Sequence, residues 1–253
     1  MSTTKQPFIT VVMPNYNGHR FVDQAIDSVL SQTYKNFELL VVDDCSKDDS
    51  LSLIQQKAQS DNRIRVIALE HNAGVANARN VGIKEAKGEY IALLDNDDLW
   101  TKDKLERQLA LAQKGADIVY SSYDFIDEEN RSIKKPFVVP QQTNFNKMLA
   151  SSVISCSTSF IKTELMQAHP FNPDFYHEDY VLWMELLRVC PTAYGDQTVL
   201  MHYRQVTGSR SNKKGNAAKE RWNTYRKALK LNAITSAWVF VRYAVNGVVK
   251  YYL

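Results

Sequence analysis

Strand-like and helix-like patterns alternate through the first half of this chain. Short apolar runs read as buried strands, and the segments between them carry apolar residues at helical spacing, as at Phe21, Ala25 and Val29. The predicted strands are 8–13, 37–42, 64–69, 90–94 and 117–122, and the predicted helices are 21–30, 49–59, 74–86 and 103–113. Strands joined through helices form βαβ units, so we predict an α/β fold with a mostly parallel sheet flanked by helices.

Polar residues gather where the predicted strands end. The clusters are Pro14–Asn17, Asp43–Ser46 and Asp95–Asp98. In open α/β sheets, ligands bind outside the carboxyl ends of the strands, so these clusters mark a candidate site. No GxGxxG or GxxxxGK[ST] pattern occurs, so the usual signatures of dinucleotide and P-loop binding are missing.

Asp95, Asp97 and Asp98 place three carboxylates within four residues after an apolar strand. Clustered carboxylates repel one another and are costly to bury, which favours a bound cation. Oxygen ligands suit Mg²⁺ or Mn²⁺, ions that often bridge to substrate phosphates. The alternative is a solvated acidic turn that caps a helix starting near Thr101.

The last 43 residues form a basic tail. From Ser211 to Leu253 there are nine Lys or Arg residues and one acid, Glu220, whereas the preceding part is net acidic. Apolar residues from Ile234 to Tyr252 repeat at helical spacing. This combination fits a helix lying on an anionic membrane through residues 222–253, and equally a helix packed on the domain or in a homodimer interface. We expect no nucleic-acid partner, because no recognition motif occurs and the body is acidic.

Cysteine usage and hydropathy bear on the compartment. Cys45, Cys156 and Cys190 form no CxxC pair, which favours a reducing cytoplasm. The polar start of the chain lacks the apolar core of a signal peptide, and no apolar run is long enough to span a bilayer. The expectation is a cytoplasmic protein, with peripheral contact to the inner face of the cytoplasmic membrane through the tail as an extension.

Four segments together resemble the family 2 glycosyltransferases, which have the Rossmann-like GT-A fold. They are 11–18 (VVMPNYNG), 40–46 (LVVDDCS), 72–98 (from NAGVANARN to LLDNDD) and 177–183 (HEDYVLW). The resemblance covers about residues 8 to 210. It implies a catalytic domain over 1–210 and a basic amphipathic helical tail over 211–253.

The resemblance also implies residues that bind the donor. Asp44 matches the aspartate that hydrogen-bonds the donor's uracil, and Pro14, Asn15 and Tyr16 match the loop that lines the nucleotide pocket. Arg79 and Asn80 stand on a helix from which a side chain can reach the nucleotide or the donor sugar. The alternative for Arg79 is an exposed helical arginine.

Asp95-Asn96-Asp97 matches the family's DxD motif. The match makes Asp97 the expected direct ligand of Mn²⁺ or Mg²⁺, with Asp95 and Asn96 near the donor or the metal. Arg204 resembles a residue of the segment that closes over the diphosphate. His202 is a candidate third metal ligand, because the histidine common after this strand is replaced by Gln205-Val206-Thr207.

Asp179 matches the family's catalytic base, and Glu178 is read as its support. A sugar hydroxyl becomes a competent nucleophile when a carboxylate accepts its proton, and a single displacement inverts the anomeric carbon. The alternative is an acidic first helical turn favoured by the helix dipole.

The expected function is that of an inverting, metal-dependent glycosyltransferase. It would move a sugar from a UDP-sugar to a glycan acceptor, lipid-linked in bacterial polysaccharide assembly. Two alternatives stay open: the same fold using dTDP-rhamnose or a GDP-sugar, and a degenerate, non-catalytic carbohydrate-binding domain. The intact Asp44, Asp95, Asp97 and Asp179 argue against the second.

Overall fold

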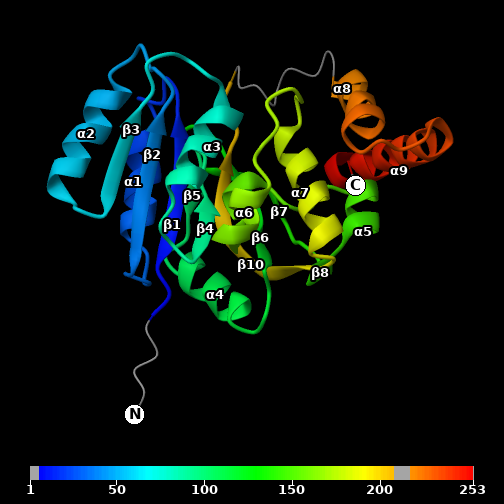
Figure 1. Cartoon of the computed structure of the whole chain (residues 1–253), viewed down its shortest axis with the longest axis horizontal. Helices are drawn as coiled ribbons and strands as arrows, with labels where there is room; N and C mark the ends of the chain where they lie inside the picture. Colours follow the sequence, from blue (N-terminus) through cyan, green and yellow to red (C-terminus); the bar gives the residue numbers. More distant parts are fainter. Residues whose placement is uncertain (1–5, 208–216, 253) are drawn as a thin grey trace.

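The structure, a computed structural model, describes residues 6–207 and 217–252 (Figure 1). The described residues form one ten-stranded sheet with helices on both faces. The strands are β1 (Ile9–Asn15), β2 (Phe37–Asp43), β3 (Ile64–Ala68), β4 (Tyr90–Leu93), β5 (Leu99–Trp100), β6 (Ile118–Ile126), β7 (Ser132–Phe137), β8 (Gln142–Thr143), β9 (Phe160–Lys162) and β10 (Ala193–Arg204). The helices are α1 (Val22–Leu30), α2 (Ser50–Ser60), α3 (Val75–Glu85), α4 (Lys104–Ala112), α5 (Phe145–Ala150), α6 (Thr163–Ala168), α7 (Glu178–Val189), α8 (Ala217–Asn223) and α9 (Ala233–Tyr252).

The sheet has the order β3-β2-β1-β4-β9-β6-β10-β5. Strands β3, β2, β1 and β4 pair in parallel, as do β6 and β10, whereas β9 is antiparallel to both β4 and β6. The predicted α/β class and helix-flanked sheet are confirmed, but the sheet is mixed. The inserted β9 was missed because three residues are too short to show a period in sequence.

The two faces of the sheet are covered by different helices. In β1, Ile9, Val11 and Met13 pack in one core cluster with residues of α1 and α4. Val12 points to the other face, which α3, α6 and α7 cover. Gly82 lets α3 approach closely, since a Cβ there would stand 2.4 Å from a methyl carbon of Val12. This packing holds the carboxyl ends of β1, β2 and β4 at one edge.

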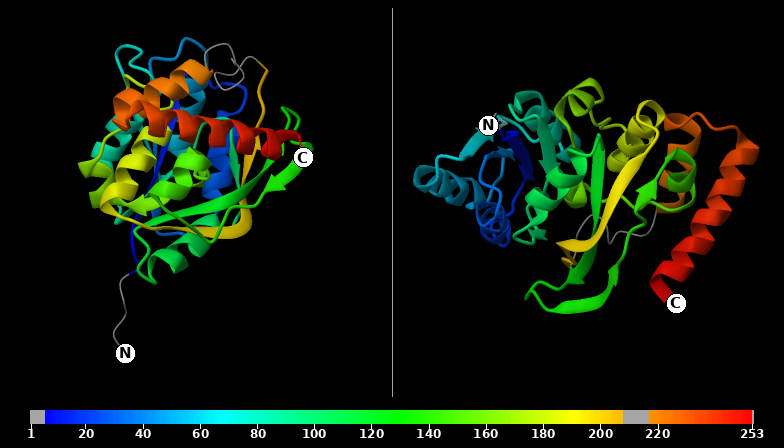
Figure 2. Two further views of the ribbon diagram at one scale, coloured as in Figure 1. Left: turned by 90° about the vertical axis from the view of Figure 1, so that its right-hand side faces the viewer. Right: turned by 90° about the horizontal axis from the view of Figure 1, so that it is seen from below.

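The tail lies beside α5 and α7 at one end of the sheet, and α9 runs along the outside of the molecule (Figures 1 and 2). Tyr225, Leu229 and Val239 are buried in the same core cluster as α7. On the outer side of α9, Ile234, Trp238 and Val241 are 85%, 58% and 61% exposed. The packed-helix alternative is therefore correct for the inner face of the tail. The predicted boundary at 210 lies outside the described residues.

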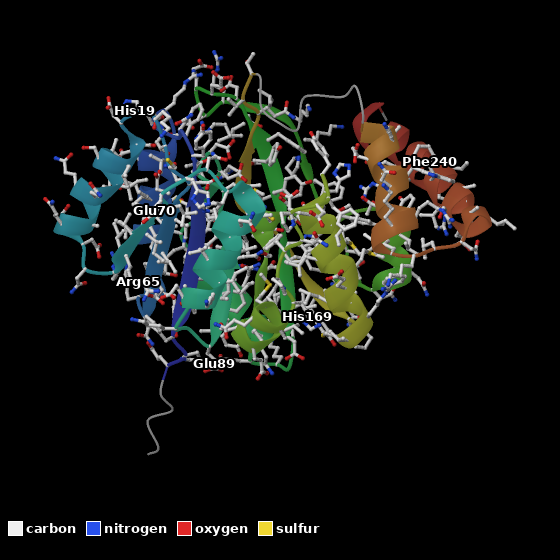
Figure 3. The ribbon with its side chains drawn as sticks, turned by 45° about the horizontal axis from the view of Figure 1, so that its top comes forward. His19, Arg65, Glu70, Glu89, His169 and Phe240 are labelled. Carbon is white, nitrogen blue, oxygen red and sulfur yellow. The ribbon has the colours of Figure 1, made fainter. Side chains whose placement is uncertain are left out.

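Phe240, labelled in Figure 3, lies on the tail side of the molecule. The centre of its ring is 6.3 Å from the centre of the Trp222 ring. Within the ranges that the structure describes, no helix combines the length and apolarity needed to cross a bilayer.

Candidate functional site

Asn15 links three segments at the carboxyl edge of the sheet. Its amide nitrogen donates to Asp43 (2.7 Å) and to Ser50 (3.0 Å), and its oxygen accepts from the Asn96 amide (2.7 Å). Asn15 is buried, so this side chain holds the ends of β1 and β2 and the loop after β4 in register. Pro14 pairs with Val42 inside the sheet.

The two aspartates after β2 have separate roles. Asp43 is fully buried and accepts from Asn15 and from the backbone and hydroxyl of Ser46. Asp44 accepts from the backbone N–H groups of Ala73 (2.7 Å) and Gly74 (2.8 Å), at the start of α3. These bonds fix Asp44, and each carboxylate oxygen keeps a second lone pair for a further donor. Contact with a donor's base stays a prediction for Asp44, as it does for the exposed Tyr16.

The carboxylates of the loop after β4 differ in their partners. Asp95 accepts from Arg79 Nη2 at 2.6 Å, and Asp98 accepts from the backbone N–H of Arg204 at 3.0 Å. Among the described residues, no Lys, Arg or His forms an ion pair with Asp97. Burial, followed by the charge of Asp95, raises the pKa of Asp97 to about 6. Burial and its two aspartate neighbours raise the pKa of Asp98 well above its usual range.

This crowding fits a divalent cation. Asp97 is a carboxylate whose ionisation is opposed by burial and by a neighbouring negative charge, so a cation beside it would relieve both. Its hard oxygens are ligands that Mg²⁺ and Mn²⁺ accept, and such ions commonly take one or two carboxylates and complete their shell with substrate phosphates. Asp97 therefore fits the role of direct ligand, with Asp95 beside it.

The imidazole of His202 on β10 is oriented by a neighbouring carboxylate. Its Nδ1 lies 2.6 Å from Asp124 Oδ1 on the neighbouring strand β6. In the described part of the chain, no three His, Cys, Asp or Glu side chains converge on a point that could hold a metal ion. Metal ligation by His202 with Asp95 and Asp97 stays a prediction, because a histidine that binds a metal through one ring nitrogen commonly bonds a carboxylate through the other.

Arg79 joins the DxD segment to the helix that bears the predicted base. Its Nη2 bonds Asp95, and its Nη1 bonds Glu178 at 3.2 Å. The side chain is buried, so the exposed-arginine alternative is wrong. Burial alone would lower the pKa of Arg79, but the charges of Asp95 and Glu178 raise it, which keeps the guanidinium charged. Arg79 holds the two acidic segments at a fixed separation.

Asn80 has a local structural role. Its amide nitrogen donates to the carbonyl of Phe171 and its oxygen accepts from the N–H of Phe171, both at 2.8 Å. The ring of Phe171 in turn lies 5.2 Å from the guanidinium of Arg79. Asn80 thus supports the loop that packs on Arg79, and its contact with the donor stays a prediction.

Asp179 lies in the first turn of α7 and is partly exposed, whereas Glu178 is buried against Arg79. One oxygen of Asp179 accepts the N–H of Tyr180 at 2.7 Å. Glu178 is thus paired with Arg79, whereas Asp179 remains partly exposed, and its role as the base stays a prediction.

Arg204, which the resemblance places in the segment over the diphosphate, bonds to the DxD loop and to neighbouring segments. It is buried, and its guanidinium donates to the carbonyls of Asp97 (2.7 Å) and Asp127 (3.2 Å) and to Asn130 and Gln24 side chains. These bonds engage all three guanidinium nitrogens, so in this structure Arg204 supports the DxD loop.

The turn Cys156–Thr158 also belongs to the site, although sequence reasoning missed it. Ser157 Oγ accepts the N–H of Asp95 (3.0 Å), and the Ser157 carbonyl accepts from Trp100 Nε1 (2.8 Å). The Cys156 thiol has its pKa raised by burial, with the nearby acids adding to the effect. This turn lies where the periodicity is weak, so only the structure could find it.

Comparison with known proteins settles the family. The family model described as glycosyl transferase family 2 matches residues 10–168. The chain belongs to glycosyl transferase family 2. It is a glycosyltransferase with the GT-A fold, as the resemblance implied.

Among family 2 relatives, the chain is 35% identical over 246 residues to WfgD of Escherichia coli, covering 96% of this chain and 94% of that protein. WfgD is named a UDP-Glc:α-D-GlcNAc-diphosphoundecaprenol β-1,3-glucosyltransferase. The solved structure of S. aureus TarS 1–349 with UDP-GlcNAc superposes with a TM-score of 0.75 at 19% identity, over 93% of this chain and 71% of that one. The mannosyltransferase PcManGT of Pyrobaculum calidifontis, solved with GDP-Man and Mn²⁺, gives a TM-score of 0.68 at 17% identity, over 98% and 76%.

Proposed function

We propose that this glycosyltransferase moves a sugar from a UDP-sugar to a hydroxyl of a bacterial glycan acceptor, with inversion at the anomeric carbon. The observation that carries the proposal is the pair of acidic segments joined by Arg79: Asp95 and Asp97 on one side, Glu178 and Asp179 on the other. The name of WfgD, with its UDP-Glc donor, and the UDP-GlcNAc complex of TarS support the choice of UDP.

Asp179 acts as the general base in this proposal. Its carboxylate takes the proton of the acceptor hydroxyl while that oxygen bonds to the anomeric carbon. The bond from this carbon to the diphosphate breaks, and its electron pair leaves with the nucleoside diphosphate. Because one displacement occurs on the face opposite the leaving group, the configuration inverts.

Asp97, with Asp95 beside it, would hold Mn²⁺ or Mg²⁺. A bound cation stabilises the charge that develops on the departing diphosphate. Arg79 holds Asp95 through an ion pair, and Arg204 holds the loop through the carbonyl of Asp97. The Mn²⁺ in the PcManGT structure supports a metal at this fold's site.

A GDP-sugar donor is a second candidate, because PcManGT, which shares the fold, was solved with GDP-Man. The same site could take dTDP-rhamnose. The experiment that decides is a screen of UDP-, GDP- and dTDP-sugars for binding and for hydrolysis with and without Mn²⁺. We expect metal-dependent binding of UDP-sugars. If only GDP-sugars or only dTDP-sugars bind in a metal-dependent way, the donor is that sugar nucleotide and not a UDP-sugar. If no nucleotide-sugar binds, the proposal is contradicted.

The acceptor is proposed to be lipid-linked, which would keep the enzyme at the inner face of the cytoplasmic membrane. The name of WfgD, which carries a diphosphoundecaprenol acceptor, supports this. Ile234, Trp238 and Val241 are exposed at helical spacing on α9, and Arg242 lies beside Trp238 with its guanidinium 4.5 Å from the ring centre. An apolar stripe edged by cations suits an anionic lipid surface.

Glutamate substitutions on this stripe test the membrane contact. Truncating the tail would remove Tyr225 and Leu229 from the core cluster that they share with α7, so the double variant Trp238→Glu/Val241→Glu is preferable. We expect the wild type to sediment with vesicles that contain anionic lipid, and the variant to bind at least about tenfold more weakly, since burying one large apolar side chain contributes about 1.5–3 kcal/mol. The control Val138→Glu alters a residue that is equally exposed, at 58%, on the segment after β7.

Binding of the wild type should also weaken as salt rises, because exposed charges are screened. If the wild type ignores anionic vesicles at low salt, the membrane contact is excluded. If the wild type is a dimer and the double variant is a monomer, the apolar stripe belongs to a homodimer interface instead.

A further inference from the structure

Arg221 on α8 is buried among aromatic rings. It is 5% exposed, and its guanidinium lies 4.1 Å from the ring centre of Tyr180, 4.3 Å from that of Tyr243 and 6.0 Å from that of Tyr225. In the described part of the chain no Asp or Glu pairs with it, and Nε and Nη1 have no hydrogen-bond partner. Residues 1–5, 208–217 and 244–253 contain no Asp or Glu that could supply a side-chain partner.

Burying a guanidinium without an acidic partner costs desolvation free energy. An apolar side chain of similar volume packs such a place without the desolvation cost that a charge carries. What arginine adds is a planar cation that is attracted to ring faces, and this attraction is stronger where water is excluded. The guanidinium therefore holds the three rings in position, and one of them is the ring of Tyr180.

Tyr180 ties the stack to the reactive end of α7. It follows Asp179 directly, and its hydroxyl donates to the carbonyl of Met148 on α5 at 3.2 Å. Its ring is thus held by α8 and its hydroxyl by α5. The far end of α7 is held separately, because Arg188 Nη2 donates to the carbonyl of Leu229 in the tail at 2.9 Å. The tail contacts α7 at both ends.

We infer that Arg221 is a positioning residue: through Tyr180 it sets the first turn of α7 and therefore the direction of the Asp179 carboxylate. The inference rests on the proposed role of Asp179 as base. In this inference the tail positions the catalytic base, a role separate from membrane contact.

The test compares Arg221→Met with the matched control Arg188→Met. Methionine keeps an unbranched, apolar chain in each place and removes the guanidinium. Arg188 lies about 13 Å further along the helix axis from Asp179. We expect Arg221→Met to lower kcat for transfer by about tenfold or more with the donor KM unchanged, because small displacements of a reacting group cost large factors in rate. Arg188→Met should keep kcat within about twofold.

The exchange rates of backbone amide hydrogens provide a second measurement, which does not depend on enzyme activity. Arg221→Met should speed exchange of amides 181–184, which bond to carbonyls of the first turn, while Arg188→Met should speed the last turn only. Arg221→Lys, which restores a cation between the rings, should recover part of kcat. If Arg221→Met does not fold, Tyr243→Leu, which removes one ring of the stack, is expected to show the same pattern.

An unchanged kcat in folded Arg221→Met, an equal loss in both variants, or unchanged exchange at 181–184 would overturn the inference. A wild type without transfer activity, but with the expected exchange pattern, would instead count against the proposed function.

Discussion

Replacing Asp97 by alanine is expected to abolish metal-dependent donor binding and to lower turnover to background. Asp97, unlike Asp95, forms no ion pair among the described residues, and its pKa is raised to about 6 by burial and Asp95. Calorimetric titration of the wild type with UDP in Mn²⁺ should show binding that EDTA removes. The variant should show no metal-dependent binding.

The fold of Asp97→Ala should survive. Because the pKa of Asp97 in the folded chain is raised above the ordinary 3.8, its ionisation at neutral pH opposes folding. Removing the carboxylate should therefore leave the metal-free free energy of unfolding equal to or above that of the wild type. Asp103→Ala, which removes a half-exposed acid just after the same loop, serves as the control and should bind the donor normally. Full wild-type activity in EDTA would exclude the metal assignment.

Replacing Asp179 by asparagine should give a different phenotype. Asparagine is nearly isosteric but cannot accept the proton of the acceptor hydroxyl. Turnover should fall about a hundredfold or more, the scale of lost general-base catalysis, while donor and metal affinity stay near wild type. Donor affinity is preserved because Asp95 keeps its ion pair with Arg79, which Asp179 does not share.

The matched control for Asp179 is Asp174→Asn in the exposed loop before α7. It makes the same chemical change a few residues away and should leave turnover unchanged. Unchanged turnover in Asp179→Asn, or loss of donor binding alone, would show that another group is the base. NMR of the product adds a separate check, since retention of anomeric configuration would exclude a single displacement.

The local pattern of the sequence was enough to find the main strands and the edge where the site lies. Strand periodicity and strand ends are properties of neighbouring residues, so β1, β2, β4 and the cluster at Asp95–Asp98 could be predicted. Strand β9 could not be predicted, because its position between β4 and β6 depends on pairing across the sheet.

Only the tertiary structure decided what several site residues do. Arg79 and Glu178 are 99 positions apart, and His202 meets Asp124 across 78 positions. Arg204 was predicted over the diphosphate, yet it bonds to groups on α1, on the DxD loop and on the turn after β6. A charged side chain pairs with whichever partner the fold brings within reach, and no local period encodes that choice.

The tail shows the same division. The sequence by itself determined a basic helix with an apolar stripe, because helical spacing and charge are read along the chain. Which apolar residues are buried depended on the surface they meet: Val239 packs with Tyr225 against α7, while Trp238 stays exposed. The sequence determined the main strands and the carboxylates at their ends. Packing between distant segments decided which contacts orient those carboxylates. A buried polar group cannot bond to water, so it must bond to whatever protein group lies next to it.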